Sequence, residues 1–109
     1  MSKVKLYIAV LDEFPDYMVP TLVAHAVLGA HLKFQDDGHY HKWLTYSFKK
    51  CVIRVGQKEF DKISALPDVY LAHENTTLDG RKSCAVTFTK LTQEVPNVLK
   101  FAKLWSPKT

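Results

Sequence analysis

The sequence predicts a single α/β domain, a three-layer sandwich built around a four-stranded mixed sheet. Three observations lead to this fold class. The segments read in the order strand, helix, strand, helix, strand, strand, helix. The 109 residues, 47% of them apolar, suit one compact domain over residues 1–109, and no linker-like stretch divides them. The loop between the third and fourth strands is too short for a crossover helix, so we expect those two strands to be antiparallel neighbours.

The first half of the chain contains two strands joined by a long apolar helix. Residues 3–11, "KVKLYIAVL", alternate and then become continuously apolar, which predicts a central strand covered on both faces. Pro20 suits the first turn of a helix, and we expect that helix to continue over residues 21–34 and to leave little of its surface exposed. Residues 39–48 favour a short helix or turn with aromatic anchors, and residues 49–56 a second strand.

The second half contains an amphipathic helix, two further strands and a closing helix. Residues 57–66 place Phe60, Ile63 and Leu66 on one face, and Pro67 stops this helix. We expect the third strand over residues 68–74 and the fourth over residues 83–91. Residues 92–105, "TQEVPNVLKFAKLW", then favour a helix that begins at a weak capping signal.

The composition is that of a soluble, mildly basic protein with a formal net charge of +4. We find no secretory signal, and no apolar run near the roughly 18 residues of a membrane span, so we expect a cytoplasmic protein with no membrane partner. Cys51 and Cys84 lie inside predicted strands, where we expect reduced thiols that act as small apolar residues. The positive charge permits a nucleic-acid partner without requiring one.

Metal and cofactor chemistry find little support in the sequence. The segment "DDGHYH" offers the ligand types of a metal site, but no second cluster has matching spacing, and we favour a solvated polar turn. The chain also lacks a phosphate-binding loop, a dinucleotide fingerprint and a nucleophile elbow. We therefore expect no metal and no cofactor. The side chains considered as ligands are Asp36, Asp37, His39 and His41.

Two polar positions are candidates for a functional site. Glu74 ends the third strand within the polar cluster His73, Glu74, Thr76 and Thr77, and ligands of α/β sheets bind at strand ends. His25 lies near the start of the first helix, where the helix dipole favours anionic ligands. The alternatives are an ordinary polar turn for Glu74 and a hydrogen-bonded core histidine for His25. We interpret His31 as structural.

The joint order and spacing of short motifs resembles the type II peptidyl-tRNA hydrolase superfamily over residues 3–105. "AHAVLGA" resembles the family's Ala-Ala-Gln-x-x-His-Ala segment and matches His25 to the family histidine. Trp43, seven residues before "KCVIRV", matches the family tryptophan and second strand. "LPDVYLAHE" resembles the third strand with its terminal acidic residue, and "VLKFAKLW" the closing helix. Residues 36–55 are also similar to an uncharacterised branch of the superfamily that lacks its lysine motif.

The resemblance implies a peptidyl-tRNA hydrolase II-like fold and a protein that hydrolyses or binds the ester of peptidyl- or aminoacyl-tRNA. It implies that Glu74 orients or deprotonates water, that His25 contacts the substrate or the tRNA end, and that Thr77 donates a hydrogen bond. The family often forms dimers, so a homodimer is a further expectation. Our candidates for phosphate contacts with tRNA are Lys49, Lys50, Arg81 and Lys82.

The chain departs from the family pattern at positions that carry chemistry. The family glycine, lysine and glutamine fall at Tyr17, Met18 and Leu22, and the family threonine falls at Leu78, beside Thr77. A thioether cannot replace an ammonium group in polarising an ester. The alternative function is therefore a catalytically inactive binding or regulatory module of the same fold, with a protein or small-molecule partner.

Overall fold

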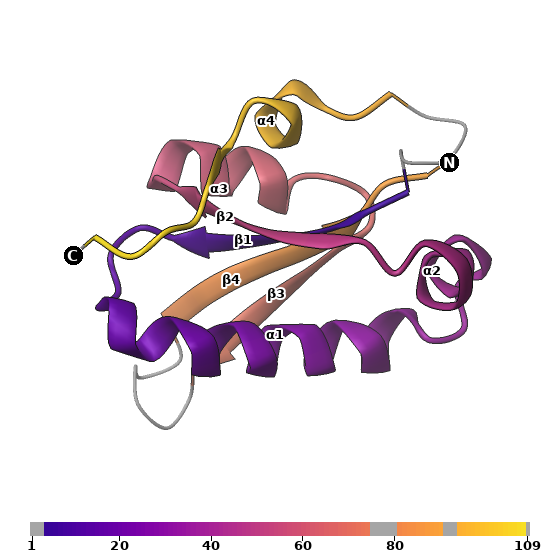
Figure 1. Cartoon of the computed structure of the whole chain (residues 1–109), viewed down its shortest axis with the longest axis horizontal. Coiled ribbons are helices and arrows are strands. Elements are labelled where there is room, and N and C mark those ends of the chain that lie inside the picture. The colour runs from indigo at the N-terminus through magenta and orange to yellow at the C-terminus, as the bar shows by residue number, and fades with distance from the viewer. Residues whose placement is uncertain (1–3, 75–80, 91–93, 109) are drawn as a thin grey trace.

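The protein folds around one mixed sheet, seen in a computed structural model that describes residues 4–74, 81–90 and 94–108 (Figure 1). The strands are β1 (Leu6–Leu11), β2 (Lys50–Val55), β3 (Val69–Glu74), β4 (Arg81–Phe88) and β5 (Lys103–Leu104). The helices are α1 (Val19–Phe34), α2 (Gly38–Lys42), α3 (Gln57–Ser64) and α4 (Asn97–Lys100), with a 3-10 turn η1 (Asp16–Met18) and a π-helical turn η2 (Trp43–Ser47). α1 covers one face of the sheet, and α3 and α4 lie over the other (Figure 1).

β1 is the central strand, as the sequence predicts. All six of its residues are buried. β1 pairs with β2 in parallel and with β4 antiparallel, within the strand order β3-β4-β1-β2-β5. β3 pairs antiparallel with β4, which confirms the expectation for the short connection between them. The α/β class and the mixed sheet are therefore confirmed.

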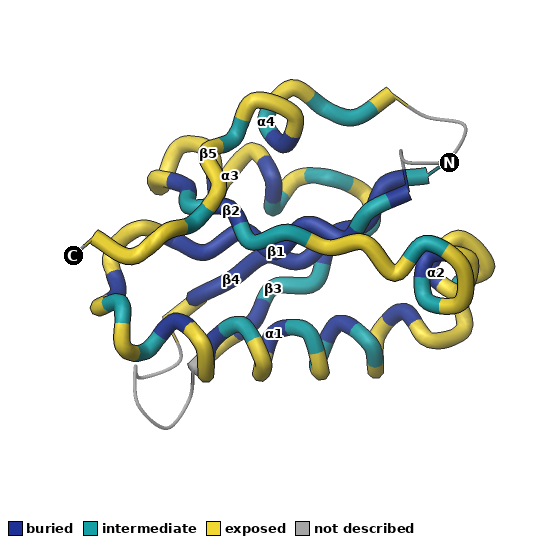
Figure 2. The backbone as a smooth tube through the Cα atoms, viewed as in Figure 1, coloured by how far each residue is buried: buried dark blue, intermediate teal, exposed yellow. Residues whose placement is uncertain are grey.

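α1 packs on the sheet through one side only. Its buried residues recur every three or four positions, as a helix with one covered face requires: Val19, Leu22, Ala26, Ala30 and Phe34. The opposite side faces solvent, where Leu28 is 66% exposed and Leu32 is 65% exposed (Figure 2). The expectation that α1 leaves little exposed is wrong, because a single sheet covers only one flank of a helix.

The segment after α1 is held by aromatic side chains. Tyr40 and Trp43 are each 2% exposed, and their rings lie 5.3 Å apart. His31 Nδ1 shares a hydrogen bond of 3.0 Å with the Tyr40 hydroxyl, which ties α1 to α2. Phe34 meets Phe88 of β4 edge-on at 5.1 Å. The predicted aromatic anchors and the structural role of His31 are thus confirmed.

The C-terminal segment differs from the predicted helix over residues 92–105. The helix α4 is only four residues long, and the chain then forms β5, whose residues pair with Ile53 and Arg54 on the edge of β2. The sheet therefore has a fifth, two-residue strand beyond the four expected. Pairing with β5 gives hydrogen-bond partners to backbone groups on the edge of β2, which would stay unpaired if this segment continued as a helix. The capping signal at Thr92 lies outside the described residues.

The contact between Gly29 and Tyr70 gives a stability prediction. A Cβ atom added at Gly29 would overlap the hydroxyl and ring of Tyr70, which packs against α1 from β3. We expect Gly29→Ala to destabilise the protein by about 1–3 kcal/mol because the tyrosine must move. In a Tyr70→Leu background the same substitution should stabilise by up to about 1 kcal/mol, because alanine has the higher helix propensity. Urea unfolding of the four proteins measures this, and additive effects would contradict the contact.

Candidate functional site

The carboxyl ends of β1 and β3 lie at the same end of the sheet, beside the start of β4. The register pairs Val10 with Cys84 and Glu74 with Arg81, which brings the two strand ends and β4 together. From β1 the chain crosses to β2 through α1 on one face, and from β2 it returns to β3 through α3 on the other face (Figure 1). Ligands of open α/β sheets bind at such a point, where the direction of the connections reverses.

A groove of about 440 Å³ lies at this end, on the α3 side of the sheet. The guanidinium group of Arg81 forms an ion pair with the Glu13 carboxylate and lies 5.1 Å from the centre of the Phe14 ring. Lys82 is exposed and contributes a second positive charge to the groove. The groove is lined by Leu11, Glu13, Gln57, Phe60, Asp61, Ser64, Arg81 and Lys82.

A β-bulge lies next to the two cations of the groove, Arg81 and Lys82. Ala72 pairs with Cys84 and His73 pairs with Lys82, so Ser83 has no partner residue on β3. A bulge adds one residue to a strand and increases its twist, and bulges recur beside binding sites because they re-aim side chains. The Ser83 side chain is fully buried and its hydroxyl finds no hydrogen-bond partner among the described residues. Arg81 and Lys82 directly precede this bulge on β4.

The wall opposite these cations comes from α3. Gln57 Nε2 donates a hydrogen bond of 2.8 Å to Asp61 Oδ1, and both residues lie on the exposed side of the helix. Ser64 Oγ donates to the Phe60 carbonyl at 2.8 Å. Sequence reasoning missed this wall. The available signal was the polar i, i+4 spacing of Gln57 and Asp61 on an amphipathic helix, which alone indicates only a solvated face.

His25 lies on the exposed surface of α1, so its interpretation as a core histidine is wrong. Gly29, one turn later, packs on Tyr70 of β3. A helical turn rises about 5.4 Å and two strand residues span about 6.6 Å, so His25 stands level with Ala72, close to the end of β3. α1 covers the face of the sheet opposite α3 (Figure 1), so the sheet separates His25 from the groove.

The other two predicted catalytic residues lie at or beyond the end of β3. Glu74 is the last residue of the strand and pairs through its backbone with Arg81. Thr77, with its neighbour Thr76, lies outside the described residues. His73 is exposed and stands opposite Lys82 on β4. The structure thus brings the backbone of Glu74 beside the two cations Arg81 and Lys82.

The four predicted phosphate contacts fall into two groups. Arg81 and Lys82 line the groove at the carboxyl end of β1. Lys50 pairs with Leu6 at the start of β1, and Lys49 precedes it. β1 spans about 17 Å between the two groups, so no single phosphate can touch both. The two pairs of cations therefore serve different parts of any bound nucleic acid.

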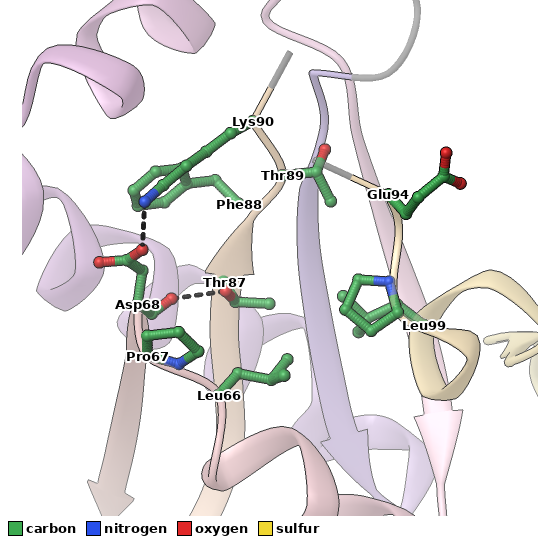
Figure 3. Close-up of a pocket in the computed structure, with 10 residues that line it drawn as sticks. Leu66, Pro67, Asp68, Thr87, Phe88, Thr89, Lys90, Glu94 and Leu99 are labelled. Carbon is green, nitrogen blue, oxygen red and sulfur yellow. Dashed lines mark hydrogen bonds and ion pairs between the residues drawn. The ribbon is translucent and has the colours of Figure 1, made fainter. Parts of the chain in front are cut away.

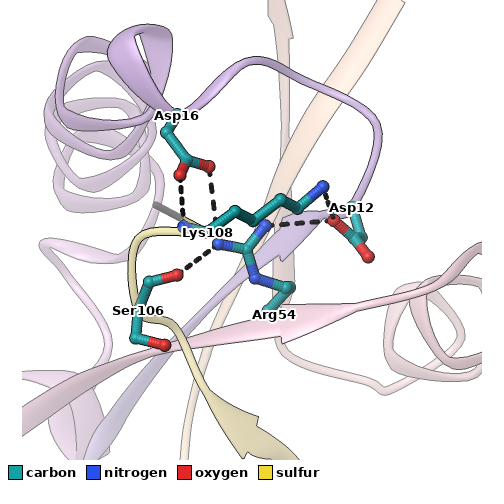
Figure 4. Close-up of polar contacts among 5 residues, drawn as sticks. All are labelled: Asp12, Asp16, Arg54, Ser106 and Lys108. Atoms are coloured by element: carbon teal, nitrogen blue, oxygen red, sulfur yellow. Dashed lines mark hydrogen bonds and ion pairs between the residues drawn. The ribbon is translucent and has the colours of Figure 1, made fainter.

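A cluster of charges anchors the C-terminal segment next to the same end of the sheet (Figure 4). Arg54 of β2 donates to Asp12 Oδ1 at 3.0 Å and to the Ser106 carbonyl at 2.5 Å. Lys108 contacts Asp12 through its ammonium group at 3.1 Å, and its backbone N–H donates to Asp16 at 2.6 Å. Hydrogen bonds from Lys108 and from Arg54 lower the pKa of Asp12 below its usual value. These contacts hold the tail across the ends of β1 and β2.

The cavity at the opposite end of the sheet is small. It has a volume of about 60 Å³, room for only a few water molecules, and lies among Pro67, Thr87 and Leu99 (Figure 3). An ion pair of 2.9 Å between Lys90 and Asp68 stands beside it. The hydrogen bond with Asp68 raises the pKa of Lys90, so this lysine stays charged. We therefore assign the cavity no ligand.

The described residues contain no metal-binding cluster, and their two cysteines serve packing. In that part of the chain no group of three or more His, Cys, Asp or Glu side chains is placed to hold a metal ion. Asp37 instead accepts hydrogen bonds from the backbone N–H groups of His39 and Tyr40 and caps α2. Burial raises the pKa of the Cys51 thiol, and Cys84 is fully buried, which agrees with their expected packing role. No described helix has the length and apolar character needed to cross a membrane.

Comparison with known proteins gives no assignment. The chain matches no family model, and it matches no curated protein sequence. The fold and the geometry of the carboxyl-end groove are therefore the observations on which a function can be proposed.

The charge cluster around Arg54 predicts a pH-dependent contribution to stability. Because the folded state lowers the pKa of Asp12, its contribution is present above the unfolded-state pKa near 3.9 and is lost as the pH falls through the folded-state pKa. We expect Asp12→Asn to cost up to about 1 kcal/mol at pH 7, since the pairs are partly exposed, and the difference to vanish in acid. Urea unfolding between pH 7 and pH 2 measures this. Asp36→Asn, an exposed aspartate, is the control; a difference from wild type that is constant with pH would refute the role of Asp12.

Proposed function

We propose that this protein is peptidyl-tRNA hydrolase-like and acts on the ester that joins a peptide or amino acid to tRNA. The observation that carries the proposal is the position of the Glu74 backbone beside Arg81 and Lys82 at one end of the sheet, with His25 on the opposite face. The exposed His25 stands near the end of β3, the backbone of Glu74 ends that strand, and the cations Arg81 and Lys82 line the adjacent groove. A carboxylate that can act as a general base, next to cations that can bind phosphate, is a combination suited to an ester on RNA.

In the proposed reaction Glu74 accepts a proton from a water molecule that attacks the ester carbonyl carbon. The bond between that carbon and the ribose oxygen then breaks, and the ribose hydroxyl leaves with the proton. His25 contacts the substrate or the terminal nucleotide, and Thr77 donates a hydrogen bond. Arg81 and Lys82 contact phosphates close to the ester. Lys49 and Lys50, at the other end of β1, contact a more distant part of the RNA.

The second candidate function is a binding module of the same fold without catalysis. Leu22, at the position of the family glutamine, is only 2% exposed and belongs to the hydrophobic core. Met18, at the position of the family lysine, packs partly buried against that core. These two side chains contribute to folding and offer no polar group to a substrate. This observation favours a catalytically inactive binding or regulatory module with a protein or small-molecule partner.

An assay for hydrolysis of N-blocked aminoacyl-tRNA separates these two functions. If the ester is the substrate, Glu74→Gln should reduce turnover by about 100-fold or more, because the amide cannot accept the proton. Glu94→Gln removes an exposed glutamate beside the small cavity and serves as the matched control, with turnover expected unchanged. No turnover by the wild type at high enzyme concentration would reject the hydrolase. Equal loss in both variants would reject the role of Glu74.

A binding experiment tests the cationic groove independently of catalysis. We expect the affinity for deacylated tRNA to fall steeply with salt, and Lys82→Gln to reduce the slope of log K against log salt by about one. Lys58→Gln, an exposed lysine on α3 that does not line the groove, should leave the slope unchanged. A flat salt response would rule out nucleic acid as the partner.

Met18→Lys tests whether the chain is a degenerate hydrolase. The substitution restores the ammonium group of the family at a partly buried position near the start of α1. Appearance of turnover only in this variant would identify the natural protein as the inactive module. Leu22→Gln is unsuitable as a companion, because it would bury an amide in the core at a cost of about 1–3 kcal/mol.

A further inference from the structure

Two aromatic side chains lie on the surface at the end of the molecule where β2 begins. Tyr46 of η2 is 87% exposed, and Phe48, which follows η2, is 55% exposed. Residues 38–50, which include both, contain three lysines and two histidines and no acidic residue. These basic side chains are all exposed: His39, His41, Lys42, Lys49 and Lys50. We call Lys42, Tyr46, Phe48, Lys49 and Lys50 the aromatic–lysine patch.

Phe48 of the patch continues a stack that begins in the core. Phe48 stacks on the buried Trp43, with ring centres 5.4 Å apart and planes inclined by 27°. The Lys50 ammonium group lies 3.5 Å from the centre of the Phe48 ring and donates to the Phe48 carbonyl at 2.8 Å. More than half of the Phe48 surface nevertheless stays exposed. The Lys50 ammonium group covers a face of the Phe48 ring, so Tyr46 is the ring of the patch that stays open to a flat ligand.

The backbone beneath the patch is held in an unusual conformation. Phe48 has φ 56° and ψ 11°, the left-handed region, where a bulky side chain is strained and glycine is the usual residue. Three contacts impose this turn. The Phe48 N–H donates to the Trp43 carbonyl at 2.7 Å, Trp43 Nε1 donates to the Lys49 carbonyl at 2.5 Å, and Ser47 Oγ donates to the Val4 carbonyl at 2.5 Å. Strain maintained by surrounding contacts recurs at ligand sites, because it presents a side chain rigidly.

We propose that the aromatic–lysine patch binds single-stranded nucleic acid. A base would stack on Tyr46, while the ammonium groups of Lys42, Lys49 and Lys50 contact the neighbouring phosphates. Exposed aromatic rings interleaved with cations are the pattern that binds single strands regardless of sequence, because every base has a flat face. The flat, exposed ring of Tyr46 favours a planar ligand over the alkyl chains of a lipid or an acidic peptide. The proposal does not depend on ester hydrolysis at the other end of the sheet.

The test measures binding of a fluorescently labelled ten-residue oligouridine by anisotropy at low and at moderate salt. We expect Tyr46→Ala to weaken binding by roughly tenfold, because one stacking platform is lost, and Tyr46→Phe to bind like the wild type. Tyr17→Ala is the matched control. Tyr17 is 82% exposed and lies near the start of α1, at the opposite end of the sheet, so its loss should leave binding unchanged. Lys49→Gln should reduce the salt slope by about one.

Several outcomes would overturn the proposal. One is absence of binding by the wild type at low salt, and another is an equal loss in Tyr46→Ala and Tyr17→Ala. If a duplex of the same length competes as well as the single strand, the patch binds through its charge alone and the stacking is rejected. Binding to anionic vesicles that depends on Tyr46, with oligouridine binding unaffected, would assign the patch to a membrane surface. Oligouridine carries no aminoacyl or peptidyl ester, so its binding is measured independently of the hydrolysis assay.

Discussion

The fold depends on the complete burial of β1. Its six residues are buried on both faces, and both of its edges are hydrogen-bonded, to β2 and to β4. A strand parallel to β1 requires a crossover, which α1 supplies on one face, and the return to β3 passes through α3 on the other. The loops from both crossovers therefore meet at the carboxyl end of β1. The groove with Arg81 and Lys82 is a consequence of that meeting.

The two ends of β1 differ in chemistry. At the carboxyl end the charges are mostly paired, Arg54 with Asp12 and Arg81 with Glu13, and these pairs fix the C-terminal segment and one wall of the groove. At the amino end, lysines without a carboxylate neighbour in the segment stand beside exposed aromatic rings. Paired charges favour a defined local geometry, whereas unpaired ones attract polyanions. An RNA long enough to span the sheet would meet both surfaces.

The turn between η2 and β2 shows how local strain is tolerated. A left-handed conformation at Phe48 costs about 1–2 kcal/mol for a residue that is not glycine. Hydrogen bonds from Trp43 and Ser47 to neighbouring backbone carbonyls offset this cost, and each bond contributes about 1 kcal/mol. The same bonds set where β2 begins, and with it the parallel register of β2 on β1. Aromatic packing at this turn therefore supports the central strand pair.

Hydrophobic periodicity predicts the type and order of β1, α1, β2, α3, β3 and β4, because it is a local property that does not depend on the packing partner. The sequence also pointed to Glu74 at a strand end and to His25 as candidate site residues, but it did not predict that His25 is exposed. Tertiary structure alone decided what covers each face and which charges meet. The sheet covers one side of α1 and leaves Leu28 exposed. Residues 103–104 become a strand because β2 has an open edge. The register of β4 places Arg81 across the groove from α3. A side-chain pattern specifies which surface is apolar, but the neighbour that buries or pairs it comes from distant parts of the chain.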